Sequence, residues 1–191
     1  MKIRHKLLIL LMLSSISLFS QSIDDLDTRN GFNQFKLGDS YIKWQSDLKP
    51  TGFKFHMPNT ELYFYTGNCC SSLFGFKIEG IFMTFQNNKL VEISIDLDRE
   101  RERQDTQYMV DCQNRLKSVL NSLVALYGTP QSIKEPKDLV RENPTYILGW
   151  IGEKVILKVE HSFIFKGGSG CKTRITVSNR EWLFNTYKPE F

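Results

Sequence analysis

Histidine is scarce in this chain, and the residue spacings that usually mark a metal or nucleotide site are missing. Only three of the 191 residues are histidines, namely His5, His56 and His161. No His-x-x-x-His or Cys-x-x-Cys pair is present to bind zinc. No Gly-x-Gly-x-x-Gly or Gly-x-x-x-x-Gly-Lys-Ser/Thr segment is present to hold a nucleotide. We therefore expect neither a metal site nor a cofactor site.

The usual signs of a catalytic residue are also absent. There is no Gly-x-Ser-x-Gly segment, which would place a nucleophilic serine on a sharp turn. Glu160 and His161 are neighbours in a predicted strand, so their side chains point to opposite faces and do not form a pair. Cys112 falls in the apolar stripe of a predicted helix, which favours packing or a disulfide over nucleophilic chemistry. The sequence predicts a protein that is not an enzyme.

No apolar run is long enough to span a membrane, which takes about 20 residues. The N-terminal segment has three basic residues ahead of a short apolar run at 7–13, and small and polar residues at 20–22. This order is typical of a cleaved secretory signal peptide, here residues 1–22. The first cysteine is Cys69, so no lipid-bearing cysteine follows the apolar run. We expect a periplasmic or secreted protein without a membrane span in its mature chain.

Excess charge of one sign is lacking once the signal peptide is removed. The chain has 25 Lys and Arg against 21 Asp and Glu, and three of the basic residues lie within 1–22. The mature chain then carries 22 basic and 21 acidic residues, a net charge of about +1, which gives no reason to expect a nucleic acid partner. No repeat, low-complexity tract or Pro/Gly linker divides residues 23–191, so we expect a single domain there.

Four cysteines lie in the mature part, and all four are candidates for disulfides: Cys69, Cys70, Cys112 and Cys171. An oxidising compartment lets disulfides persist, and four cysteines allow three pairings. A ring closed between adjacent residues strains the peptide bond, so we expect Cys69 and Cys70 each to reach a distant partner. Cys171 follows the glycine-rich segment 167–170, which would let it swing onto the loop that holds Cys69 and Cys70.

One long helix is predicted from about residue 105 to residue 127. Apolar residues recur there at spacings of three and four, which puts them on one stripe of a helix. Gly128 and Pro130 end the pattern. A second, short helix is predicted over 40–48, ahead of Pro50. The apolar stripe of the long helix must lie on a hydrophobic surface.

That surface is predicted to be a sheet built around a hairpin at 75–97. Residues 91–97 alternate between apolar and polar side chains, which indicates a half-buried strand. Asn87 and Asn88 are suited to the positive φ angles of a two-residue turn. Counting from that turn predicts four opposed pairs, which are Thr84 with Val91, Phe82 with Ile93, Gly80 with Ile95, and Ile78 with Leu97.

Further strands are predicted on both sides of this hairpin. They cover 32–37 and 61–66 upstream, and 146–150, 154–165 and 173–178 downstream. In the strand 154–165 the predicted inward row is Val155, Leu157, Val159, Phe163 and Phe165. The expected fold class is α+β, a mostly antiparallel sheet of about six or seven strands with one long and one short helix packed on one face.

Two surfaces are candidates for binding. The aromatic residues Tyr63, Tyr65 and Trp150 would make a platform for a glycan or a lipid tail if one face of the sheet is exposed. The alternating run from Asp96 to Glu102 would align the carboxylates of Asp96, Asp98, Glu100 and Glu102. Such a row would hold a divalent cation or an acid-base pair, although a charged loop between strand and helix is commoner.

Acidic residues also gather near the mature N-terminus, at Asp24, Asp25 and Asp27. A calcium loop of the EF-hand type would need glycine and glutamate where this chain has Asn30 and Lys36. The pattern therefore predicts a solvated, flexible segment.

Two pieces of the chain carry a family resemblance. One is the run Phe35-Lys36-Leu37-Gly38-Asp39-Ser40 with the helix that follows it, and the other is the helix 116–127 running into Gly128-Thr129-Pro130. Together they resemble small exported bacterial α/β envelope proteins of the beta-lactamase-inhibitor-like and SmpA/OmlA type, over about a fifth of the chain. The resemblance implies a protein that binds a partner protein and is not an enzyme, and no binding residue is carried over from it.

Three functions are therefore open at the level of sequence. The first is an exported non-enzymatic protein that binds another macromolecule through an exposed sheet face or the loop 67–72. The alternative is a carbohydrate or small-ligand binding protein, with a glycan or lipid on aromatic platforms. The third is a hydrolase that uses the acidic residues between Asp96 and Glu102.

Overall fold

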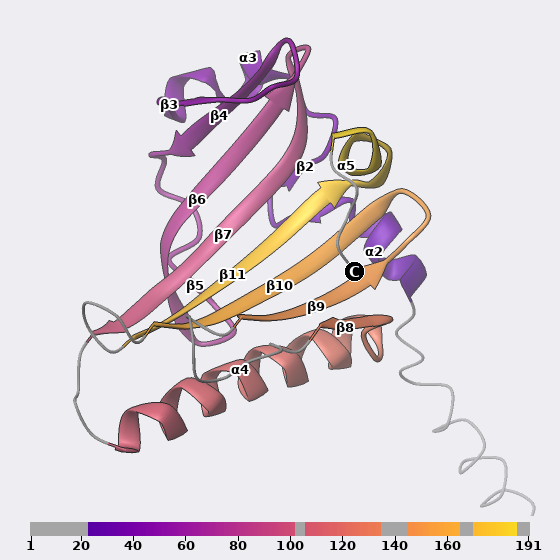
Figure 1. The fold of residues 1–191 in the computed structure, drawn as a ribbon. Coiled ribbons are helices and arrows are strands. Elements are labelled where there is room, and N and C mark those ends of the chain that lie inside the picture. The colour runs from indigo at the N-terminus through magenta and orange to yellow at the C-terminus, as the bar shows by residue number, and fades with distance from the viewer. Residues whose placement is uncertain (1–22, 102–105, 135–144, 165–169, 187–191) are drawn as a thin grey trace, which may run out of the picture.

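The computed structural model describes residues 23–101, 106–134, 145–164 and 170–186 of the chain. They form an α+β fold in which one large antiparallel sheet carries helices on its faces (Figure 1). The predicted fold class is confirmed. The predicted signal peptide, residues 1–22, lies outside the described residues. None of the described helices is both long and apolar enough to cross a membrane.

Nine strands make up the large sheet, in the order β3-β4-β6-β7-β11-β10-β9-β8 with β5 added on β6. Their bounds are β3 (Leu48–Lys54), β4 (Thr60–Tyr65), β5 (Ser72–Leu73), β6 (Phe76–Gln86), β7 (Lys89–Arg101), β8 (Ser132–Lys134), β9 (Thr145–Ile151), β10 (Val155–Ile164) and β11 (Gly170–Asn179). The segment predicted as one strand over 32–37 is instead a separate tight hairpin of β1 (Gly31–Phe32) and β2 (Phe35–Lys36). It turns at Asn33, which has a φ of 51°.

The predicted hairpin is present as β6 and β7, and Asn87 and Asn88 form its turn with φ angles of 49° and 61°. The predicted register is wrong over most of its length. Phe85 lies opposite Leu90 and Thr84 opposite Glu92, because an irregularity after the turn leaves Val91 without an opposite residue.

This shift by one residue exchanges the faces of the strand. The predicted core-facing row is Thr84, Phe82, Gly80 and Ile78. In the structure Ile81, Met83 and Phe85 belong to the core of the covered face, while Thr84 is buried outside that cluster and Phe82 is half-buried. The shift places three large apolar side chains in the core. A second irregularity restores the predicted pairing at the far end, where Ile78 lies opposite Leu97.

The C-terminal strands agree with the predicted pattern. Val155, Leu157, Val159 and Phe163 are at most 3% exposed, whereas Phe165 lies outside the described residues. β10 pairs with both β9 and β11, and β11 in turn pairs with β7 from the middle of the chain. The last strand therefore joins the two halves of the sheet.

Helices cover both faces of the sheet. Their bounds are α2 (Ile23–Arg29), α3 (Tyr41–Trp44) with the 3₁₀ turn η1 (Gln45–Asp47), α4 (Thr106–Tyr127) and α5 (Arg180–Thr186). α4 is the predicted long helix, and α3 with η1 is the predicted short one. α4 and residues 23–38, which we call the N-terminal segment and which contain α2, β1 and β2, pack on one face of the sheet. We call this the covered face, and it carries Ile95 and Val159. The predicted long and short helices, α4 and α3, both pack on the covered face. α5, which the sequence did not predict, packs on the opposite face, where Trp182 and Leu183 contact Ile156.

Candidate functional site

A cavity of about 400 Å³ opens on the covered face, between the N-terminal segment and the C-terminal half of α4. Strands β10 and β11 supply its floor, the β1–β2 hairpin and the residues around β5 supply two walls, and α4 supplies a third. The lining residues are Arg29, Gly31, Phe32, Asn33, Lys36, Ser72, Leu73, Phe74, Leu123, Leu126, Tyr127, Leu157, Ile175 and Val177. Seven elements, α2, β1, β2, β5, α4, β10 and β11, thus border one half-open space.

Most of this lining is apolar or aromatic. The floor residues Leu157, Ile175 and Val177 are at most 3% exposed, so the space ends on the hydrophobic core. Leu123 belongs to the same core. An interior of this kind accepts apolar groups and penalises polar groups that lack a partner.

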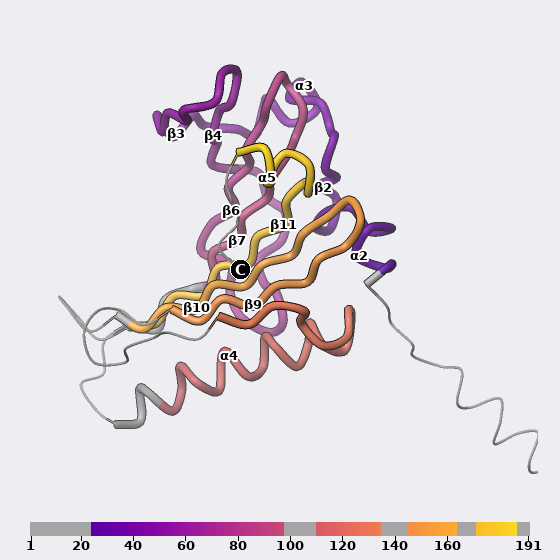
Figure 2. Tube along the Cα trace, turned by 45° about the vertical axis from the view of Figure 1, so that its right-hand side comes forward, coloured from indigo at the N-terminus to yellow at the C-terminus, as the bar shows by residue number. Residues whose placement is uncertain are grey.

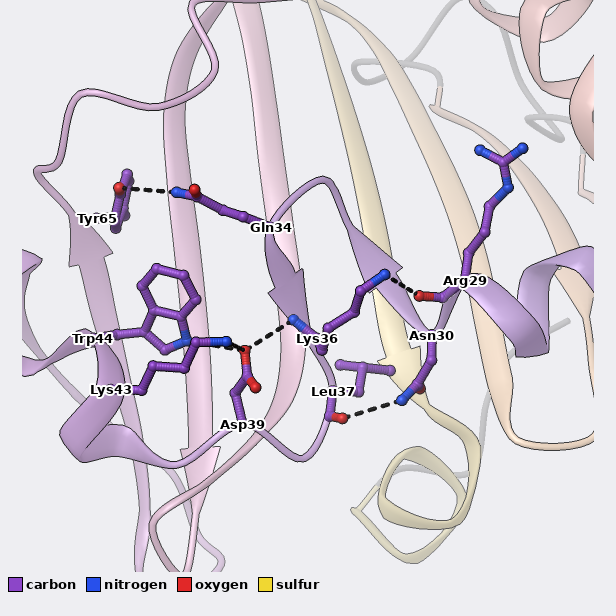
Figure 3. A network of polar contacts seen from close by, with 9 residues as sticks. All are labelled: Arg29, Asn30, Gln34, Lys36, Leu37, Asp39, Lys43, Trp44 and Tyr65. Carbon is purple, nitrogen blue, oxygen red and sulfur yellow. Dashed lines mark hydrogen bonds and ion pairs between the residues drawn. The ribbon is translucent and has the colours of Figure 1, made fainter.

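The polar part of the lining is gathered near the N-terminal segment and is basic. Lys36 donates a hydrogen bond from Nζ to the backbone carbonyl of Arg29, at 2.6 Å. The Arg29 guanidinium lies 5.9 Å from the centre of the Tyr127 ring, and in Figure 3 it extends away from its own carbonyl. No carboxylate is among the lining residues.

Burial raises the pKa of the Tyr127 phenol, the charge of Arg29 lowers it, and the charge of Asp25 raises it. The net shift is upward, so Tyr127 stays neutral at physiological pH. The cavity therefore has two cationic side chains and no anionic one.

The carboxylate of Asp39 holds the N-terminal segment to α3 (Figure 3). It accepts hydrogen bonds from the Lys36 amide at 3.1 Å, from Lys43 Nζ at 2.9 Å and from Trp44 Nε1 at 3.1 Å. Burial alone would raise the pKa of Asp39, but these bonds outweigh it and leave the pKa below its ordinary value. The carboxylate thus fixes the strand that carries Lys36 in place beside the cavity.

Helix α2 is anchored by Asp27, which the sequence predicted to be solvated and flexible. The Asp27 carboxylate accepts hydrogen bonds from three consecutive backbone amides, at Glu153, Lys154 and Val155, over 2.5–2.9 Å. It also fills the space that a side chain would need at Gly152. Both views place α2 beside the turn between β9 and β10 (Figures 1 and 2). That prediction is wrong for Asp27, because its partners are backbone groups far along the chain.

A disulfide between adjacent residues, Cys69 and Cys70, lies next to the cavity. Cys70 adopts a left-handed φ of 66°, and Asn33 donates a hydrogen bond to Cys70 Sγ at 3.0 Å. The expectation that each of these cysteines would reach a distant partner is wrong. Asn33 itself lines the cavity, as does Ser72 two residues beyond Cys70, so the disulfide supports one wall.

The second disulfide joins Cys112 of α4 to Cys171 of β11, with 6.0 Å between their Cα atoms. Both cysteines are fully buried. Cys171 is therefore bonded to α4, because β11 runs directly beneath α4, and not to the loop that holds Cys69 and Cys70, which is the partner that the sequence predicts.

The proposed aromatic platform is not a surface. Tyr63, Tyr65 and Trp150 are 7%, 8% and 0% exposed, because all three point into the covered face. Trp150 also donates a hydrogen bond from Nε1 to the Gly128 carbonyl at 2.8 Å. These residues pack the core, and the aromatic surface predicted for them is wrong.

Asp96, the first carboxylate of the predicted acidic row, is 5% exposed and already paired. It accepts hydrogen bonds from Arg174 at 2.6 and 2.9 Å and forms an ion pair with Lys172 Nζ at 2.7 Å. Burial alone would raise the pKa of Asp96. The hydrogen bonds and charges of Arg174 and Lys172 outweigh this effect and hold the pKa below its ordinary value. The side chains of Asp98, Glu100 and Glu102 lie outside the described residues.

His161 is fully buried beneath α4. Its Nδ1 lies 2.8 Å from Thr173 Oγ1. Burial, assisted by the charge of Arg115, lowers its pKa to about 4. Glu160 lies on the opposite face, where it pairs with Lys158 Nζ at 3.2 Å. Within the described residues, no group of three or more His, Cys, Asp or Glu side chains is placed to hold a metal ion.

A second cavity, of about 330 Å³, lies at the tip of the β6–β7 hairpin. Its lining is mainly polar: Tyr41, Asn59, Glu61, Phe85, Asn87 and Asn88. Asn59 Nδ2 donates to Asn87 Oδ1 at 3.2 Å.

Comparison of the chain with protein-family models, with curated proteins and with solved structures gives no match. The resemblance to small exported envelope proteins therefore stays a prediction.

Proposed function

We propose that this protein is an exported, non-catalytic binding protein that holds a small apolar ligand in the cavity beside α4. The observation that carries the proposal is the half-open cavity with its buried apolar floor. Its volume of about 400 Å³ falls in the range of ligand sites, about 300–1,000 Å³, which are mostly apolar with a few placed polar groups.

The two disulfides support the compartment in this proposal, because such bonds persist where the surroundings are oxidising. Export of the mature chain to the periplasm or the exterior is the prediction made from residues 1–22. The two together favour an extracytoplasmic ligand.

A macromolecular partner, predicted from the sequence, remains a prediction. The segment 67–72, predicted to contact such a partner, instead leads into a wall of the cavity, with Ser72 among the lining residues. This placement favours the alternative of a small ligand.

Binding of a neutral apolar probe, N-phenyl-1-naphthylamine, tests the proposal in the purified exported protein. We expect a saturable rise in fluorescence with one site per chain. Leu126→Trp should abolish it, because an indole at this lining position fills the space. Val124→Trp is the matched control, since Val124 lies on the same helix but is 36% exposed.

Thermal unfolding of both variants establishes that they are folded. Probe binding lost in Leu126→Trp and kept in Val124→Trp supports the proposal. No saturable binding by the unmodified protein, or equal binding by the two variants, overturns it.

The polar second cavity favours one other candidate, a carbohydrate site. Amide and carboxylate groups beside aromatic rings suit sugar hydroxyls, and Tyr41, Asn59 and Glu61 supply them here. A glycan that raises the unfolding temperature of the protein, with the rise lost in Asn59→Ala and kept in Asn68→Ala, would establish this site. Asn68 is exposed and is not among its lining residues.

A further inference from the structure

We infer that the ligand of the cavity beside α4 is an anionic amphiphile, an acyl or alkyl chain that ends in a single anionic head group. This inference rests on the proposed function and specifies its ligand. It follows from the distribution of charge over the lining, from the shape of the apolar part, and from the contacts that the two cations make.

The charge of the lining comes from Arg29 and Lys36 alone. Among the described residues neither side chain takes part in an ion pair. Arg174 and Lys172, by contrast, are both paired with Asp96. Two positive charges beside an apolar space, without a carboxylate in the lining, attract an anion.

The present contacts of both side chains leave donors for such an anion. Lys36 uses one hydrogen bond on the Arg29 carbonyl, and an ammonium has three N–H donors. The Arg29 guanidinium rests near the Tyr127 ring. A guanidinium binds a carboxylate or phosphate through paired N–H donors, so Arg29 suits either head group.

The rest of the lining requires the ligand to be apolar beyond its head. From the two cations the space continues past Phe32 and Phe74 down to Ile175 and Val177 on the floor. A methylene group takes about the volume of a water molecule, about 30 Å³, so this space accommodates a chain of about ten carbons. A head group at the cations and a chain along the floor satisfy both parts of the lining.

Calorimetric titration with four chains of equal length tests the inference. The ligands are dodecanoate, dodecyl phosphate, dodecanol and dodecyltrimethylammonium, each below its micelle concentration. We expect the two anions to bind at least tenfold more tightly than dodecanol and the cation to bind most weakly. The tighter of the two anions identifies whether the head group is a carboxylate or a phosphate.

The double variant Arg29→Gln, Lys36→Gln should bind dodecanoate no more tightly than dodecanol, and should keep its affinity for dodecanol. The control Lys77→Gln, Lys117→Gln removes the same charge from exposed positions outside the lining and should keep the preference. As single variants, Lys36→Arg should bind dodecanoate more tightly than Lys36→Gln, because it keeps the positive charge.

The outcomes separate the two levels of the argument. Equal binding of dodecanoate and dodecanol overturns the anionic ligand but leaves the apolar binding site intact. Equal loss of anion affinity in the control pair also overturns it, because the effect would then come from net charge alone. If none of the four chains binds, the proposed function fails as well.

Discussion

The two halves of helix α4 meet the sheet in different ways. In the first half, Cys112 is fully buried and covalently joined to Cys171 of β11. In the second half, Val119 and Leu123 pack into the core, whereas Leu126 and Tyr127 border a cavity of about 400 Å³. One helix is therefore covalently joined to the sheet near one end and borders a cavity near the other.

The contrast between the two halves of α4 suggests how the structure keeps a cavity open. A helix free to move would settle onto the apolar floor, since close packing is favourable and voids are not. The disulfide at Cys112 fixes the first half of α4 on β11, and the N-terminal segment, anchored through Asp27, lines another side of the cavity. The two disulfides have different roles: the first fixes the helix on the sheet, and the second, at Cys69 and Cys70, shapes a wall of the cavity.

The largest effect should follow from breaking the disulfide between α4 and β11. Replacing Cys112 and Cys171 by alanine removes a cross-link between residues 59 positions apart, and a loop of this length is worth about 4 kcal/mol in the free energy of unfolding. Urea unfolding of the oxidised protein measures the loss. If the pair Cys69→Ser, Cys70→Ser lost as much, the two disulfides would not differ as described.

The anchor of the N-terminal segment should have the next largest effect. Asp27→Ala removes the acceptor of three backbone amides, and the loss should lower the free energy of unfolding by about 3 kcal/mol. Asp25→Asn, in the same helix, is the matched control and should cost under about 0.5 kcal/mol. Binding of the cavity probe should weaken in Asp27→Ala and stay the same in Asp25→Asn. Unchanged binding in Asp27→Ala would show that α2 does not support the wall.

His161 of β10, which is buried beneath α4, should make the stability of the protein depend on pH. Its pKa of about 4 in the folded protein lies below the ordinary 6.5. Below pH 6.5 the His161 side chain therefore binds a proton in the unfolded chain, whereas in the folded protein it stays neutral down to about pH 4. Stability is complete above pH 6.5 and is lost as the pH falls, by about 2 kcal/mol between pH 8 and pH 5.

Urea unfolding of His161→Gln at pH 8 and pH 5 measures this contribution. The variant should lose about 2 kcal/mol less than the unmodified protein over this interval. His56→Gln, at an exposed position, should keep the full dependence. The same slope in all three proteins would contradict the assignment to His161.

The smallest effect on stability is expected from the adjacent disulfide. Its ring encloses no long loop, so Cys69→Ser with Cys70→Ser should change the free energy of unfolding by less than about 1 kcal/mol. Affinity for the cavity probe should fall by a factor of about five, equivalent to about 1 kcal/mol, because Ser72 and its neighbours lose their support. An unchanged affinity would show that the disulfide does not shape the wall.

The sequence predicts the fold well where one pattern continues over many residues. Helix α4 and strands β6, β7, β9, β10 and β11 all have long periodic runs of apolar residues. The strands β3, β5 and β8 were not predicted, since β3 is mostly exposed and the other two have only two and three residues. The register of β6 and β7 was missed because an unpaired residue such as Val91 leaves no mark in the alternation.

The site was not predictable in the same way. Its lining comes from seven elements, and each contribution has the sequence pattern of ordinary core or of ordinary surface. Arg29 and Lys36 look like solvated charges in the sequence, and only the fold brings them to one space. Asp27 gave no signal because backbone amides are present at every position, and nothing in their sequence marks those at 153–155.

The position of β11 has a consequence for how the chain is made. β11, the last of the described strands in chain order, lies between β7 and β10 in the middle of the sheet. Until residues 170–179 are available, two long strands have open edges and no native sheet can close. The native sheet therefore forms only after residues 170–179 have been made, and its folding depends on contacts between distant segments. Such a chain can still be threaded through a narrow channel at a stage when a protein built from local contacts would already have folded.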